Sequence, residues 1–223
     1  MAIPRIELFK DLSERELTEL EQTSLKETFK KKEAVFSEGE PSEWFCILTK
    51  GKIKITKLSY DGKEIILEII KAPDFFGGLA VLKGFPYPAS AIAMEESEVI
   101  KIPRAVFLKL VEKYPSINKA MLSFLIDRVK VTQETLKSVA LERVETRVAS
   151  ALLRLSEKYG STEKNGLMID LRLTKQELAD MVGTTVETAI RIMSKFKKSG
   201  YLNEKDGKII IKDINKLKEL SES

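Results

Sequence analysis

The sequence predicts an α+β protein: a β sandwich or barrel, then one long helix, then a winged helix-turn-helix. Alternating apolar and polar residues, punctuated by glycine, run from residue 32 to 103 and indicate many short strands. An apolar stripe with heptad spacing follows within residues 116–141. Two helical patterns around Gly183 and a hairpin signal come last. The predicted domains are residues 1–115, 116–142 and 143–223.

Composition narrows the possible functions. The chain has 223 residues, 43% of them hydrophobic, and this is enough for real cores. It contains no apolar run of membrane-spanning length and no signal-peptide pattern, so we expect a cytoplasmic protein that does not enter a membrane. The absence of histidine excludes His-based catalytic triads, His-ligated zinc and His-ligated haem. A single cysteine cannot by itself hold an iron–sulfur cluster. We therefore expect that the protein binds no metal or cofactor and that it is not an enzyme.

Charge is unevenly distributed along the chain. From Arg143 to the end there are 16 lysines and arginines against 12 acidic residues, whereas the preceding residues carry 22 of each. All of the excess positive charge therefore lies in the part that holds the helix-turn-helix. Binding to nucleic-acid phosphates needs such an excess.

The first segment predicts a short helix. Ser13 and Glu16 have the spacing of a capping box, and Leu17, Leu20 and Leu25 suggest one apolar face. The strands that follow are expected at residues 43–49, 52–57, 65–70, 90–94 and 98–102, with Asp61-Gly62 as a hairpin turn. Trp44 and Cys46 are interpreted as packing residues, because a lone thiol in an apolar strand is usually inert.

One loop, residues 74–82, interrupts the strand pattern with Gly77-Gly78. Two glycines before a short helical segment can aim backbone N–H groups at an anion. They are equally what a tight turn from strand to helix needs, and the sequence leaves both readings open.

The long helix carries a straight apolar seam. Its members are Leu122, Leu125, Val129, Thr132, Leu136 and Val139. This spacing favours a two-stranded coiled coil between two copies of the chain. The alternative is that the stripe packs only against its own β domain. Thr132, within the seam, and Arg128, beside it, are candidates for setting register or touching a ligand.

After a helix at residues 144–158 and a polar loop at 159–165, the helix-turn-helix begins. Thr174 with Glu177, and Thr184 with Glu187, have capping-box spacing on either side of Gly183. Buried faces are expected at Leu178, Ala179 and Val182, and at Ala189, Ile192, Met193 and Phe196. Strands 201–205 and 208–212 around Asp206-Gly207 form the wing, and a last helix lies near residues 214–220. An ordinary helical hairpin with a surface Glu187–Arg191 pair is the alternative.

Three segments carry a resemblance to a known family. They are Phe76-Gly77-x-Leu79-Ala80, Leu173-Thr174-x-x-Glu177-Leu178-Ala179-x-x-x-Gly183 and Val186-Glu187-Thr188-x-x-Arg191. With Leu8-Phe9-x-x-Leu12-Ser13 at the start, the chain resembles the Crp/Fnr family of bacterial transcription regulators along nearly its whole length. The resemblance implies a jelly-roll-like β-roll sensor, a dimerisation helix, a DNA-binding winged helix-turn-helix and RNA polymerase as a partner.

The resemblance also assigns base-reading residues. Glu187 and Arg191 stand where the family reads cytosine and guanine, a pairing that side-chain geometry supports. Val186 stands where the Fnr branch has valine, which favours a TTGA-like half-site in an inverted repeat, although Ile190 replaces the serine common in that branch. The expected DNA contacts are Thr174, Thr184, Thr185, Val186, Glu187, Arg191 and Lys195, with the threonines contacting phosphates or capping helices.

The sensor departs from the cyclic-nucleotide-binding members. Gly78 and Pro88 stand where those members have the glutamate and arginine that hold the ribose and the cyclic phosphate, so control by cyclic AMP is not expected. Thr132 falls where that branch has a ligand-touching threonine, and Arg128 where the nitrogen-control branch has an arginine. Two possibilities remain for the effector: it is an anionic metabolite, or the protein needs no effector. The candidate effector residues are Gly77, Gly78, Leu79, Ala80, Arg128 and Thr132.

The main alternative function is a small-molecule-binding module whose winged helix contacts protein instead of DNA, since a net charge of +4 is modest. An enzyme is disfavoured because no histidine and no paired carboxylates in a pocket-like motif are present.

Overall fold

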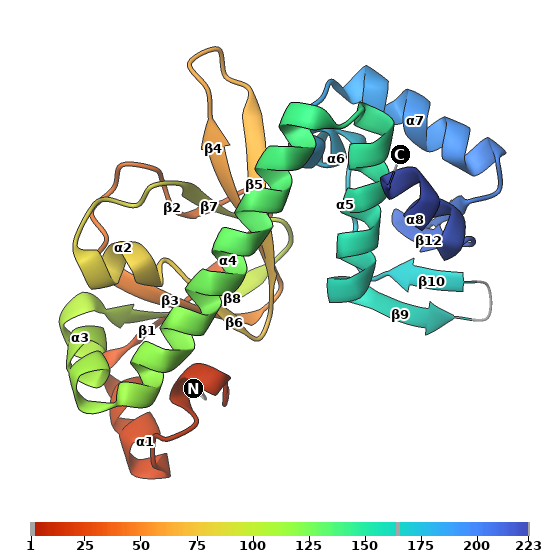
Figure 1. The fold of residues 1–223 in the computed structure, drawn as a ribbon. Coiled ribbons are helices and arrows are strands. Elements are labelled where there is room, and N and C mark those ends of the chain that lie inside the picture. Colours follow the sequence, from red (N-terminus) through yellow and green to blue (C-terminus); the bar gives the residue numbers. More distant parts are fainter. Residues whose placement is uncertain (1–2, 164–165, 223) are drawn as a thin grey trace. The chain divides into compact units, whose positions relative to one another are not determined.

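The computed structural model describes residues 3–163 and 166–222. Its internal contacts divide the chain into two units, Met1–Val129 and Lys130–Ser223, and each is described by itself. This division falls inside the long helix and at neither predicted boundary, so the three-part division stays a prediction. The predicted order of a β-rich domain, a long helix and a helix-turn-helix with a small sheet is confirmed (Figure 1).

The first unit begins with the short helix η1 (Glu7–Phe9) and with α1 (Glu14–Thr23). Ser13 and Glu16 form the predicted capping box, each side chain accepting the other residue's backbone N–H. Leu25 was wrongly placed on this helix. It is the first residue of the next strand and is 48% exposed, because α1 ends at Thr23 and the chain turns into extended structure at Ser24.

Eight strands of the first unit form two antiparallel four-stranded sheets. One has the order β1 (Leu25–Phe29), β8 (Ser97–Pro103), β3 (Trp44–Lys50) and β6 (Asp74–Phe76). The other has the order β2 (Ala34–Phe36), β7 (Ser90–Ala93), β4 (Lys52–Leu58) and β5 (Glu64–Lys71). Neighbouring strands are mostly distant in sequence, as in a jelly roll. Two helices, α2 (Gly78–Lys83) and α3 (Arg104–Lys113), complete the roll.

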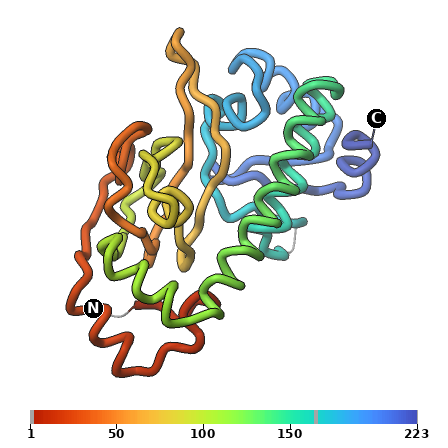
Figure 2. Tube along the Cα trace, turned by 60° about the vertical axis from the view of Figure 1, so that its left-hand side comes forward, coloured from red at the N-terminus to blue at the C-terminus, as the bar shows by residue number. Residues whose placement is uncertain are grey.

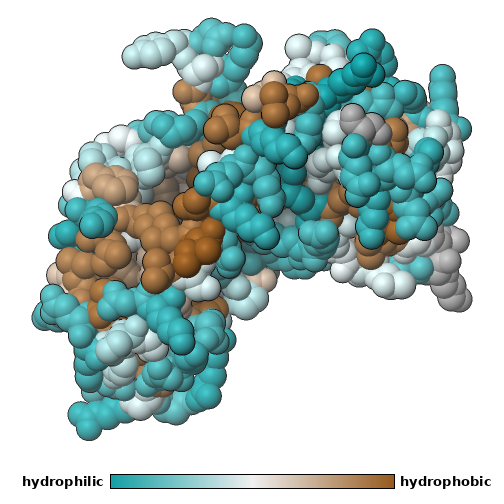
Figure 3. Space-filling view, viewed as in Figure 1, coloured by the Kyte–Doolittle hydropathy of each residue, from teal (hydrophilic) through white to brown (hydrophobic). Residues whose placement is uncertain are grey.

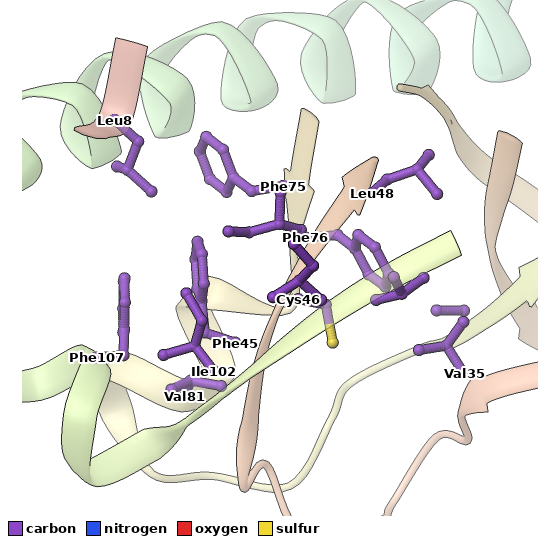
Figure 4. Close-up of a cluster of buried hydrophobic side chains, with 14 of the residues drawn as sticks. Leu8, Val35, Phe45, Cys46, Leu48, Phe75, Phe76, Val81, Ile102 and Phe107 are labelled. Carbon is purple, nitrogen blue, oxygen red and sulfur yellow. The ribbon is translucent and has the colours of Figure 1, made fainter. Parts of the chain in front are cut away.

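An aromatic part of the core joins strands β3 and β6 to the helices of the first unit. The Phe45 ring stacks on Phe107 and on Phe75, with centroids 4.0 Å and 5.6 Å apart. Cys46, the next residue of β3, is fully buried, and its sulfur points away from Phe45 and Phe107 (Figure 4). Burial raises the pKa of its thiol to about 12. The prediction that Trp44 and Cys46 are packing residues is confirmed, since both pack in or against this core.

The β4–β5 hairpin extends beyond its neighbours in the sheet (Figures 1 and 2). Its turn contains Asp61-Gly62, as predicted, and Gly62 has a left-handed φ of +78°. The register between β4 and β5 shifts once: Ile55 pairs with Glu68, whereas the next residue, Thr56, pairs with Ile66. Leu67 is therefore the extra residue of a β-bulge, a feature that re-aims side chains locally.

The long helix α4 runs from Pro115 to Leu141 and exposes the predicted apolar seam. Hydrophobic side chains gather along it in the space-filling view (Figure 3). Leu122 is 58% exposed, Val129 53% and Leu136 69%. Burying such residues in a partner stabilises by roughly 25 cal/mol per Å² of apolar area. Much of the stripe is thus exposed in the described part of the chain.

The second unit contains α5 (Val144–Tyr159), α6 (Lys175–Val182), α7 (Val186–Lys198) and α8 (Ile214–Ser221). Its sheet has the order β11 (Leu202–Lys205), β12 (Lys208–Ile211), β10 (Gly166–Ile169) and β9 (Gly160–Glu163). The hairpin at Asp206-Gly207 is confirmed. The predicted loop at 159–165 is wrong for 160–163, which form β9, while residues 164 and 165 lie outside the described residues. This strand exposes all four residues and depends on pairing with β10, so no alternating pattern marks it.

Candidate functional site

The first helix of the helix-turn-helix is capped as predicted. The Thr174 hydroxyl accepts the Glu177 N–H at 3.1 Å, and the Glu177 carboxylate accepts the Thr174 N–H at 2.8 Å. Gly183 ends α6 with a left-handed φ of +63°, a conformation that favours glycine. The Arg147 guanidinium donates to the Gly183 carbonyl at 3.1 Å and holds this turn on α5.

The second helix begins one residue later than predicted. Its N-cap is Thr185, whose hydroxyl accepts the Thr188 N–H at 3.3 Å. The expected Thr184–Glu187 capping box is wrong, because the Thr184 N–H is already bound to the Ala179 carbonyl at 3.0 Å. Thr184 thus belongs to the closing turn of α6. The carboxylate of Glu187 takes no part in capping and is left exposed.

Replacing Thr185 by alanine is expected to lower the free energy of unfolding by about 1 kcal/mol, since one orphan N–H of α7 loses its acceptor. Urea unfolding of the purified protein measures this change. Thr184→Ala is the matched control and should cost less. A larger loss for Thr184→Ala than for Thr185→Ala would contradict the assignment of the cap.

The helix α7 has one buried face and one exposed face. Ala189, Ile192, Met193 and Phe196 are buried, as predicted. Glu187 and Arg191 lie on the exposed face. Among the residues that the structure describes, no ion pair joins these two, so the surface pair expected of an ordinary helical hairpin is not formed. Both side chains are available to a ligand.

Lys195 is exposed, but its ammonium already has an acidic partner. Its ammonium contacts both carboxylate oxygens of Glu145 on α5, at 2.7 and 2.9 Å. The pair borders an open hollow of about 450 Å³ that also contains Arg143, Thr188 and Arg191. Sequence reasoning missed Arg143 and Glu145, because only packing of α5 against α7 brings them to this surface. The positive charge of Arg143, the N-cap residue of α5, is the sequence feature that could have pointed to this surface.

A second candidate site is a cavity of about 220 Å³ in the first unit. Gly77, Gly78, Leu79, Ala80 and Arg128 line it together, whereas Thr132 is not among its lining residues. Pro88 also lines the cavity. The remaining lining residues are Phe36, Ile55, Lys57, Leu67, Phe75, Phe76, Tyr87, Ala89, Met121 and Phe124. The cavity is therefore mostly apolar, with two cations.

Different structural constraints explain why glycine occupies positions 77 and 78. Gly77 has a φ of +76° at the N-cap of α2, which L side chains rarely adopt. At Gly78 an added Cβ would lie 2.9 Å from the Phe45 ring and 3.0 Å from the Met121 Cε. A turn and close packing thus explain this pair of glycines without an anion. A glutamate at position 78 would require the aromatic core to shift.

Each cation of the cavity has an acidic partner. The Arg128 guanidinium is 2.6 Å from a Glu68 carboxylate oxygen and lies 5.4 Å from the Phe124 ring centroid. The Lys57 ammonium is 2.8 Å from a Glu38 carboxylate oxygen, and Lys57 is more exposed than Arg128.

Within the described part of the chain, no group of three or more Cys, Asp or Glu residues is placed to hold a metal ion. No described helix is long and apolar enough to cross a membrane.

Comparisons with known proteins match a segment of each unit. Residues 26–114 match the cyclic nucleotide-binding domain family, and residues 146–220 match the Crp-like helix-turn-helix domain family. A CRP-like cAMP-activated global transcriptional regulator of Mycobacterium tuberculosis is 30% identical over 189 residues, which cover 85% of this chain and 84% of the relative.

Two further matches, one in sequence and one in fold, cover more of the chain. An anaerobic regulatory protein of Bacillus subtilis is 29% identical over 90% of this chain and 86% of its own length. Among solved structures, a CooA mutant from Carboxydothermus hydrogenoformans superposes with a TM-score of 0.81 at 24% identity, covering 99% of this chain and 98% of the other.

Proposed function

Because this chain belongs to the Crp/Fnr family of DNA-binding transcription regulators, we propose that it binds as a homodimer to an inverted repeat of TTGA-like half-sites. The observation that carries the proposal is the exposed face of α7, where Glu187 and Arg191 are one helical turn apart and not paired with each other. A recognition helix presents such side chains to base edges in the major groove.

Glu187 and Arg191 have complementary hydrogen-bonding roles. A carboxylate accepts from cytosine N4, and a guanidinium donates in a fork to guanine O6 and N7. Cytosine and guanine on opposite strands of TTGA–TCAA satisfy both. Thr174 and Thr185 are exposed at the N-termini of α6 and α7, where helix dipoles and free N–H groups favour phosphate. Val186 and Thr184 are half-buried and would contact DNA only at their edges.

Dimerisation would come from α4. Its seam exposes apolar area at Leu122, Val129, Leu136 and Val139, and heptad spacing matches a partner helix of the same sequence. Two-fold symmetry then places the two recognition helices about one turn of DNA apart. RNA polymerase as a partner and action in the cytoplasm follow from the family alone.

The cavity in the first unit would hold a small effector other than cyclic AMP. Gly78 and Pro88, which line it, have no charge for a ribose or a cyclic phosphate, and Phe45 leaves no room for a side chain at position 78. The Mycobacterium relative is described as cAMP-activated, so the difference would lie in the pocket and not in the fold.

Fluorescence anisotropy tests the proposal directly. The full-length protein, with nothing added, is titrated onto a duplex carrying a TTGA–TCAA inverted repeat and onto a scrambled duplex at the same salt concentration. Selective binding is expected, and added cyclic AMP should leave it unchanged. Equal binding to both duplexes, with or without cyclic AMP, would contradict the half-site. No binding to either duplex even at low salt would favour the alternative of a winged helix that contacts protein.

Neutralising Glu145 is expected to strengthen DNA binding without changing its selectivity. Glu145→Gln releases Lys195 for a phosphate, so affinity should rise for specific and scrambled duplexes alike. The slope of log affinity against log salt should steepen by about 1. Salt titrations of the variant and the wild type measure both effects. A change confined to the specific duplex would contradict a phosphate role for Lys195.

A further inference from the structure

We infer that the cavity in the first unit selects a small aromatic monocarboxylate, and that Glu68 competes with this ligand for Arg128. The inference rests on the effector site proposed above and names its ligand class and its counterion. The juxtaposition that carries it is an aromatic cavity whose more buried cation is already bound by a carboxylate of the protein.

The volume of the cavity suits a small ligand. A cavity of about 150 Å³ lined by Leu, Ile and Phe accommodates benzene, and drug-sized ligands need roughly 300–1,000 Å³. At about 220 Å³ this cavity lies between the two. A single aromatic ring with a short polar substituent fits that volume.

The lining determines which part of the ligand lies where. Rings of Phe36, Phe75, Phe76, Tyr87 and Phe124 line the cavity, and they favour an aromatic body over a sugar or a phosphate. Phe36 and Tyr87 are stacked on each other with centroids 3.7 Å apart, so they form a rigid wall. The polar end of a ligand has only the cationic side available.

Arg128 is the better placed of the two cations. Its side chain is 30% exposed against 46% for Lys57, and its guanidinium lies over the Phe124 ring. A planar guanidinium binds a carboxylate through two parallel hydrogen bonds, and does so more strongly where water is partly excluded. A ligand carboxylate is therefore expected at Arg128.

Glu68 already provides a carboxylate at this point. It follows Leu67, the bulged residue of β5 that lines the cavity, and its side chain is 24% exposed. An incoming monocarboxylate must take the place of Glu68 on Arg128 or share the guanidinium with a like charge. Either route lowers affinity, so Glu68 sets a threshold concentration for the effector. Displacement also exchanges a link between β5 and α4 for one between the ligand and α4.

The test compares one charged and one neutral ligand of equal size on the full-length protein. Phenylacetate and 2-phenylethanol are titrated while the fluorescence of Trp44 is followed. Trp44 is the only tryptophan in the sequence, and its carbonyl accepts a hydrogen bond at 2.6 Å from Tyr87, a lining residue. Calorimetry provides an independent value. The variants are Glu68→Gln, Arg128→Gln and, as a matched control, Glu38→Gln, which frees the other lining cation.

Glu68→Gln is expected to bind phenylacetate about tenfold more tightly than the wild type, because a charged competitor is removed while the shape of the side chain is kept. Glu38→Gln should stay close to the wild type, and Arg128→Gln should lose the preference for phenylacetate over 2-phenylethanol. The alcohol should bind all four proteins alike.

Three results would overturn the inference: equal affinity of Glu68→Gln and wild type for phenylacetate, an equal gain in Glu38→Gln, or no binding of phenylacetate to any of these proteins. Thermal unfolding confirms that each variant is folded. Anisotropy on the TTGA–TCAA duplex without phenylacetate is measured separately. Loss of DNA selectivity with intact ligand competition would count against the proposed DNA function, and the reverse would count against this inference alone.

Discussion

Replacing Leu136 by glutamate is expected to break the proposed dimer into monomers and to weaken binding to the inverted repeat by roughly 10²–10⁴-fold, the gain that linking two binding modules provides. Leu136 is 69% exposed, more than Leu122, Val129 or Val139 of the same seam, and a charge there would lie against its own copy in the partner helix. The loss arises because a monomer engages only one half-site at a time.

Sedimentation velocity measures the oligomeric state, and anisotropy on the inverted repeat measures the affinity. Lys137→Glu is the matched control. It changes the charge of the same helical turn by more than Leu136→Glu does but leaves the apolar stripe intact. A Leu136→Glu protein that stays dimeric would show that the two copies associate through a surface other than the stripe. Equal dissociation of Lys137→Glu would show a general charge effect.

Replacing Arg191 by alanine is expected to remove about 1–3 kcal/mol of discrimination at one base pair of the half-site. The guanidinium is exposed on α7 and not paired with Glu187, so its fork is available to a guanine. The ratio of affinities for the TTGA–TCAA duplex and for a duplex altered at that guanine measures the effect. An Arg191→Ala protein with an unchanged ratio would refute the assignment.

Lys195→Ala separates base reading from phosphate binding. Its ammonium is shared with Glu145, which limits its use on DNA. The variant should weaken binding uniformly across sequences and leave the discrimination ratio unchanged. If Lys195→Ala altered the ratio as much as Arg191→Ala, the two side chains would have to be reassigned.

The sequence predicted those elements whose signals are local. The capping boxes at Ser13 and Thr174 connect residues three apart, and the buried face of α7 repeats at helical spacing, so no distant contact is needed to see them. The hairpin turns at Asp61-Gly62 and Asp206-Gly207 were also readable, since left-handed φ values at such positions favour these residue types.

The errors have one physical origin, which is competition from neighbouring structure. Thr184 has the spacing of a cap, but its N–H closes the turn after α6, and so the cap passes to Thr185. Residues 160–163 have a loop-like composition, but pairing with β10 makes them a strand. Leu25 continues the apolar periodicity of α1 beyond the point at which the helix has ended.

The sequence by itself determined the order of elements, the absence of histidine chemistry and the residues on the exposed face of the recognition helix, because these depend on residue type and short spacing. Only the tertiary structure decided which charges meet. The Arg128–Glu68 and Lys195–Glu145 pairs join residues that are far apart along the chain, and the crowding of Gly78 by Phe45 depends on how two segments pack. Such contacts are set by packing between elements, and no local pattern encodes them.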